Sequence, residues 1–115
     1  MPPFEETDEP PEWDQEEAGW LLGKYVIVGV TRLRADGATL IGQAQYHGKI
    51  ITVDKKKGVE IECAGKWLGQ HIWLPPHLSA FDPADKGEYR LRSTGEVVND
   101  PDVVSSWTVK EPPKA

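Results

Sequence analysis

The side chains best suited to bind a metal or to act as a nucleophile are one cysteine and three histidines. Cys63, His71 and His77 are separated by eight and six positions, and His47 lies upstream of them. Structural zinc sites usually draw their ligands in close pairs, such as two cysteines separated by two residues. The sequence contains no such pair, so we expect neither a metal site nor a bound cofactor.

The surroundings of Cys63 also disfavour covalent catalysis. Apolar and polar residues alternate from Val59 to Cys63, which places the thiol on an apolar face. Burial there raises the pKa of a thiol and lowers its reactivity. The sequence has no Gly-x-Ser-x-Gly elbow and no glycine-rich loop that ends in Gly-Lys-Ser/Thr. A single cysteine also excludes a disulfide within the chain and favours a reducing, cytoplasmic location.

Carboxylates offer the remaining route to catalysis. Glu60 and Glu62 share one face of a predicted strand, and a solvated strand surface explains them without acid–base chemistry. We therefore expect a protein that is not an enzyme. A catalytic or small-ligand site around His71, His77 and Glu88 is the least favoured alternative.

Three consecutive lysines could contact phosphate groups. Lys55, Lys56 and Lys57 occupy the turn of a predicted hairpin, and Tyr46 on the preceding segment could stack on a base. Eight of the 19 acidic residues precede residue 18, where no basic residue occurs; the other 11 accompany all 13 basic residues. That small positive excess is below what dedicated nucleic-acid binders carry. Binding of single-stranded nucleic acid or of a nucleoprotein is therefore the alternative function.

The sequence pattern predicts that these residues lie on strands joined by turns. A run rich in valine and isoleucine covers residues 24–34, and Ala35-Asp36-Gly37 supplies a tight turn into a return strand over residues 38–47. Pairing residue 34 with 38 places Val30 opposite Gly42. One face then carries Val26, Val28 and other apolar residues, as expected of a core.

The second face of this hairpin is too apolar for an ordinary solvated surface. It carries Tyr25, Ile27, Ile41 and His47 among more polar residues. Another strand, the tryptophan-bearing arm near the N-terminus, or a partner subunit could cover it. We expect this face to bind a protein partner or a second copy of the chain.

The next hairpin alternates cleanly between apolar and polar residues. Its strands cover residues 49–53 and 59–63, and its predicted inward face carries Ile51, Ile61 and Cys63. The run Gly48-Lys-Ile-Ile-Thr-Val-Asp54, followed by Gly58-Val-Glu-Ile-Glu, is similar to the bent second and third strands of small SH3-like and Sm-like barrels. That resemblance implies a binding role as a class.

Shorter strands complete the predicted domain. They cover residues 70–74, 88–92, 96–98 and 103–110, with one helical turn over residues 77–81 and the large residues Trp73 and Trp107 in the core. The stretch from Trp73 to Trp107, which includes Trp73-Leu-Pro-Pro-His-Leu-Ser-Ala-Phe81, resembles a block of short bacterial proteins without an assigned function. The expected fold class is all-β, a small antiparallel SH3-like barrel of six to seven strands with one short helical turn.

The two ends differ in composition from the middle. Residues 1–19 are rich in proline and acidic residues, so we expect a disordered acidic tail before a barrel over residues 20–110 and a frayed end over residues 111–115. Trp13 either is incidental to the tail or docks on the domain or a partner. No apolar run is long enough to span a bilayer, so no membrane partner is expected. The expected function is a non-enzymatic module that binds a protein or associates with itself.

Overall fold

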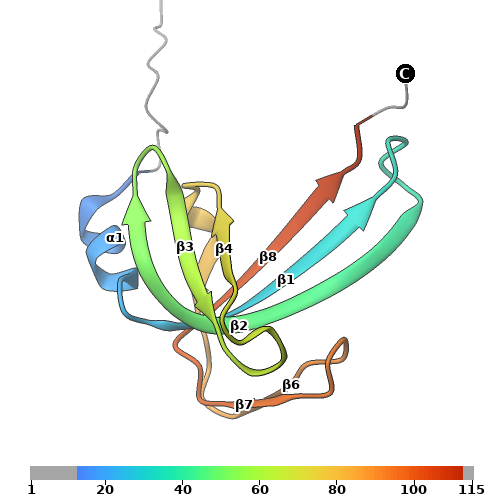
Figure 1. Cartoon of the computed structure of the whole chain (residues 1–115). Coiled ribbons are helices and arrows are strands. Elements are labelled where there is room, and N and C mark those ends of the chain that lie inside the picture. Colours follow the sequence, from blue (N-terminus) through green and yellow to red (C-terminus); the bar gives the residue numbers. More distant parts are fainter. Residues whose placement is uncertain (1–12, 113–115) are drawn as a thin grey trace, which may run out of the picture.

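The computed structural model describes residues 13–112. Most of its regular structure is β, as expected, and two sheets contain all eight strands (Figure 1). The larger sheet has the order β4-β3-β2-β1-β8-β5 and comprises β1 (Tyr25–Leu33), β2 (Leu40–Asp54), β3 (Gly58–Cys63), β4 (His71–Leu74), β5 (Phe81–Pro83) and β8 (Val103–Lys110). The smaller one pairs β6 (Glu88–Arg90) with β7 (Val97–Asn99).

The larger sheet departs from the expected antiparallel barrel in two ways. β1 and β8 run parallel, with Val30 opposite Trp107, whereas the other neighbouring strands run antiparallel. Among the described residues the sheet does not close, because β4 and β5 form its two ends. A parallel pair needs a long connection, and the chain between β1 and β8 supplies it with all the other strands.

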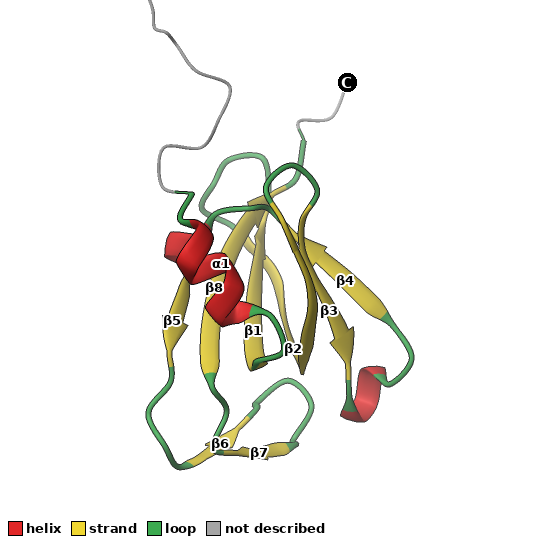
Figure 2. Ribbon diagram, turned by 90° about the vertical axis from the view of Figure 1, so that its left-hand side faces the viewer, coloured by secondary structure: helices red, strands yellow, loops and turns green. Residues whose placement is uncertain are grey.

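A helix precedes the first strand, where the sequence suggested a tail. α1 (Gln15–Leu21) begins after Asp14, whose carboxylate accepts hydrogen bonds from the N–H groups of Glu16 and Glu17. Such a side chain satisfies N–H groups that the first helical turn leaves without partners. Figure 2 shows α1 in red at the start of the described chain. α1 buries Ala18 and Leu21, and Trp13 packs against the same core.

The disorder expected for residues 15–19 is wrong, because these residues belong to α1. Residues 1–12 of that tail and most of the expected frayed end lie outside the described residues. The alternative in which Trp13 docks on the domain is the one the structure adopts.

The β1–β2 hairpin keeps the predicted faces with a different register. Val30 lies opposite Ala44 rather than Gly42, a shift of two residues that leaves the alternation intact. One residue of the shift comes from a longer turn, in which Asp36 accepts hydrogen bonds from the N–H groups of Ala38 and Thr39. The other comes from an irregularity between Arg32, which pairs with Gly42, and Leu33, which pairs with Leu40.

β2 is one long strand with an irregularity after Ile50, where the sequence suggested two strands divided at Gly48. The irregularity turns the Ile50 side chain inward, and Ile50 is fully buried. Ile51, which was expected at this place in the core, is only half-buried. A side chain at Gly48 would meet the main chain of Glu62, so the close β2–β3 pairing explains this glycine.

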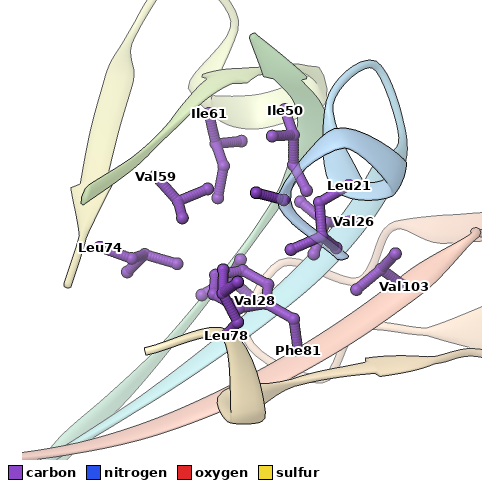
Figure 3. Packing of buried hydrophobic residues seen from close by; sticks show 11 residues of the cluster. Leu21, Val26, Val28, Ile50, Val59, Ile61, Leu74, Leu78, Phe81 and Val103 are labelled. Atoms are coloured by element: carbon purple, nitrogen blue, oxygen red, sulfur yellow. The ribbon is translucent and has the colours of Figure 1, made fainter. Parts of the chain in front are cut away.

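The main core fills the concave side of the sheet (Figure 3). Its buried residues come from α1, from β1–β4, from Val103 on β8 and from the segment around the predicted helical turn, which forms as a 3-10 turn over Leu78–Ala80. Leu78 and Phe81 close the core from that segment. Trp107 is half-buried at its margin, whereas Trp73, expected in the core, is 47% exposed on β4.

The β6–β7 ribbon covers part of the second face of the sheet. Leu91 and Val98 form a small buried cluster with Ile27, and Tyr25 packs against it. Figure 1 shows the ribbon crossing the lower end of the larger sheet. The expected protein-binding face is thus largely covered by the chain itself: Ile27 and His47 are buried, and of its four sheet residues only Ile41 is exposed.

Candidate functional site

The open side of the larger sheet carries an apolar groove. β4 pairs only with β3, so its outer edge has no strand partner within the described residues. β5 pairs with β8 only as far as Ser105, so the rest of that edge of β8 has no strand partner there either. Between these two edges lies a groove of about 560 Å³. Its lining includes Val30, Tyr46, Ile72, Trp107 and Val109. A volume of this size is within the range of ligand-binding clefts.

Contacts inside the chain hold Tyr46 and Trp107, two of the three aromatic residues that line the groove. The ring of Tyr46 lies 5.3 Å from that of Trp67, whose indole N–H donates to the main-chain carbonyl of Gln45. The indole N–H of Trp107 donates to Ser105 Oγ at 2.8 Å, and its ring meets Phe81 edge-on at 6.0 Å. Both side chains are therefore oriented before any ligand binds, which lowers the entropy cost of binding.

The charge around the groove is basic. Lys110 belongs to its lining, and none of the described lining residues carries a carboxylate. The β2–β3 turn lies beside the end of β4, since a side chain at Gly58 would meet the carbonyl of Leu74. Asp54 in this turn accepts hydrogen bonds from the N–H groups of Lys56 and Lys57, which lowers the pKa of its carboxyl. The lysine turn thus lies next to one wall of the groove.

A polar hollow of about 590 Å³ lies elsewhere on the sheet. It is lined by Gly29, Gln43 and Arg92 among other residues, and the Ser93 N–H donates to Gln45 Oε1 at its margin. Arg92 is its one charged residue among those described. The aromatic and aliphatic lining of the groove makes the groove the stronger binding candidate.

The structure also brings together three polar residues that the sequence did not connect. The Tyr25 hydroxyl lies 2.7 Å from Nδ1 of His47, and Nε2 of His47 lies 3.3 Å from Oε1 of Glu96. No other hydrogen-bond partner serves these two facing atoms, Nε2 and Oε1, in the part of the chain that is described. The group fixes the β6–β7 ribbon, through Glu96, to β1 and β2.

The electrostatics of this polar cluster suit anchoring. Burial, followed by the nearby Glu96 carboxylate, raises the pKa of the Tyr25 hydroxyl, so Tyr25 stays protonated and is a poor nucleophile. Burial acts to raise the pKa of Glu96, but the N–H of Lys66, Thr94 and the neighbouring His47 outweigh it, and the pKa is lowered. The Glu96 carboxylate is therefore ionised at neutral pH.

The residues considered for metal binding and catalysis lie apart or are already paired. Cys63 is buried as expected, and burial raises the pKa of its thiol. His71 contacts Glu60 at 2.7 Å, and Glu60 also accepts from Thr52. Among residues 13–112 no group of three potential ligands has the geometry for a metal ion. His77 lies near Trp107, at 6.4 Å between rings.

The structure places two further residues that the sequence singled out for binding. Tyr46 lines the groove, and Trp13 packs against the core instead of being presented to a partner. Sequence reasoning missed Trp107 and Val109 as groove residues. The alternation along residues 103–110 predicts that these two side chains share a face. No sequence pattern in this segment indicates that β8 extends beyond the last residue that pairs with β5.

Comparison of the chain with protein-family models, with curated proteins and with solved structures found no match. No helix in the described part of the chain is long and apolar enough to cross a bilayer.

Proposed function

We propose that this protein is a non-enzymatic binding module that holds a segment of a protein partner in the groove between β4 and β8. The observation that carries the proposal is the groove itself, an aromatic and aliphatic cleft left open where the sheet does not close. An apolar cleft with few polar groups is the usual form of a binding site.

Exposed apolar side chains along the groove support this function. Trp73 is 47% exposed and Val109 is 49% exposed, and both line the groove. Tryptophan is among the residues that contribute most to protein interfaces. The bent β2 strand and its short turn into β3 carry the resemblance to small SH3-like barrels, a class associated with binding, which agrees with this proposal by analogy.

Single-stranded nucleic acid is the second candidate ligand. Tyr46 lines the groove and the lysine-bearing β2–β3 turn lies beside the end of β4, and stacking next to basic residues suits single strands. The groove itself contributes one lysine and mostly aliphatic surface, so we favour a protein segment.

Selection of peptides on the whole chain tests the function. A phage-displayed library of random peptides is selected on the immobilised protein, and the selected peptides are measured by calorimetry. We expect Val109→Asp and Trp73→Ser to weaken binding at least tenfold, whereas Ile41→Asp, an exposed aliphatic position outside the groove, leaves it unchanged. Failure to select any peptide, or equal binding to all three variants, would refute the proposal. A single-stranded oligonucleotide whose salt-dependent binding is lost in Val109→Asp would favour the second candidate.

A further inference from the structure

We infer that the occupant of the groove is an extended, acidic segment of a protein partner that joins the edge of β4 as an additional strand. This inference rests on the proposed function, because it specifies how the groove holds its occupant and which charge the occupant carries.

The first observation is the hydrogen-bonding state of β4. The Cys63 N–H donates to the carbonyl of Gln70 at 2.9 Å, just before β4 begins. In an antiparallel ladder the bonded residues alternate, so Ile72 and Leu74 bond to β3. The main-chain groups of His71 and Trp73 therefore point away from β3 and have no strand partner within the described chain.

The second observation is a matching edge across the groove. The Glu111 N–H donates to the carbonyl of Leu33 at 2.8 Å, which places the main-chain groups of Val109 and Glu111 toward β1. The groups of Thr108 and Lys110 then face the other way, beyond the point where β5 stops pairing. The groove is thus bordered by two unpaired strand edges, and such an edge is a template for an added strand.

The floor between these edges selects the side chains of the added strand. Successive side chains of a strand point to opposite faces, so every second residue of the occupant would meet Tyr46, Val30 and Trp107. These contacts favour apolar residues at alternate positions, while the residues between them remain in solvent.

Charge complementarity selects the solvent-facing positions. Lys110 lies in the lining, and Lys56 and Lys57 lie on the turn beside the end of β4. On the neighbouring outer surface of β3, Glu60 is held by Thr52 and His71, and Glu62 is exposed at 4.0 Å from Nε2 of His71. An acidic segment therefore gains attraction along the groove, whereas a basic segment is repelled.

A designed peptide tests both parts of the inference. The probe is a blocked ten-residue peptide in which valine and glutamate alternate, titrated into the full chain labelled with ¹⁵N. At saturation we expect amide hydrogen exchange at His71 and Trp73 to slow at least tenfold. The Ile72 amide already faces β3, so its exchange serves as the internal control. The lysine version of the peptide, and a version with N-methyl groups on alternate main-chain nitrogens along one edge, should each bind at least tenfold more weakly.

The outcomes separate this inference from the proposed function. Equal binding of the two N-methylated isomers, methylated on one edge or on the other, would overturn strand addition. The proposed function would still hold if Val109→Asp lost binding, because that variant tests the groove alone. Equal or tighter binding of the lysine peptide would overturn the acidic preference. Slower amide exchange at His71 and Trp73 in the protein alone at rising concentration would assign the β4 edge to a second copy of the chain. Stronger protection by a peptide of residues 1–12 than by the designed peptide would assign it to this chain. Either result would overturn a segment of a protein partner as the occupant.

Discussion

The Tyr25 hydroxyl lies 2.7 Å from Nδ1 of His47, and His47 is 7% exposed. A neutral imidazole in this position accepts a hydrogen bond from the Tyr25 hydroxyl at Nδ1 and presents its Nε2–H to Glu96. One histidine side chain therefore connects two strands of the larger sheet to the loop that precedes β7. Each of the two ring nitrogens faces a polar atom, so loss of either neighbour leaves a buried polar atom without a partner.

Tyr25→Phe is expected to lower the free energy of unfolding by about 1–3 kcal/mol, because it leaves Nδ1 of His47 buried and unpaired. Tyr89→Phe is the matched control, since its hydroxyl donates to the Asp85 carbonyl at an exposed site. The control should lose less, about 0.5–1.5 kcal/mol or under. Urea denaturation of both variants provides the measurement, and equal losses would argue against an anchoring role for the Tyr25–His47 contact.

Glu96 is expected to make stability depend on pH in acid. Its pKa lies below the ordinary 4.5 in the folded protein, so its stabilising contribution is fully present above pH 4.5 and is lost as the pH falls through the folded pKa. Glu96→Gln should therefore unfold more easily than the unsubstituted chain at pH 7, and the gap between them should narrow below pH 4.5. Thermal unfolding at a series of pH values measures this gap. A gap that stays constant down to pH 2 would contradict the assignment.

Gly65→Ala is expected to displace the Glu96 carboxylate. A side chain at residue 65 would meet Glu96 Oε2 and Nε2 of His47, and the residue has a φ of 64°. Gly69→Ala is the matched control, because its φ of 91° imposes backbone strain with open space around the new methyl group. We expect Gly65→Ala to destabilise the protein by about 1–3 kcal/mol more than the control, through the lost pairing of buried polar groups. Indistinguishable melting temperatures would show that the carboxylate is not needed there.

The N-terminal helix is expected to contribute to stability. Asp14→Ala removes the side chain that accepts from the first-turn N–H groups and should cost about 1 kcal/mol. Leu21→Ala empties a fully buried position and should cost about 2–5 kcal/mol. Glu16→Ala, an exposed position of the same helix, is the control with little effect on the midpoint of urea unfolding. If Leu21→Ala unfolded like the unsubstituted chain, α1 would not be part of the core.

The positions of the strands and of the second hairpin follow from local patterns. Alternation from Val59 to Cys63 predicted both the β2–β3 pairing at Val53 and Val59 and the burial of the thiol. The register of the first hairpin was wrong by two residues. One comes from a turn that is one residue longer than the predicted three, and one from the irregularity between Arg32 and Leu33. Face assignments survived this error, since a shift of two residues preserves the alternation.

The helix and the site were predicted less well, for different reasons. The pair Asp14 and Glu17 carries the spacing of a helix N-terminus, a signal that the acidic composition obscured. The groove had no comparable signal. It depends on β8 extending past β5 and on a parallel pairing between Val26 and Val103, residues far apart in the chain. The cluster of Tyr25, His47 and Glu96 likewise forms only when the ribbon folds across the sheet.

The parallel pairing of β1 with β8 has a consequence for biosynthesis. Among the described strands β1 leaves the ribosome first, and one of its two edges is completed only by the last of them, β8. Until β8 emerges, the main-chain groups of β1 on that side have no lasting partner in the nascent polypeptide. We expect the fold to be completed slowly, because this contact joins distant parts of the sequence. During translation the incomplete sheet would be open to chaperone binding and to cleavage by proteases.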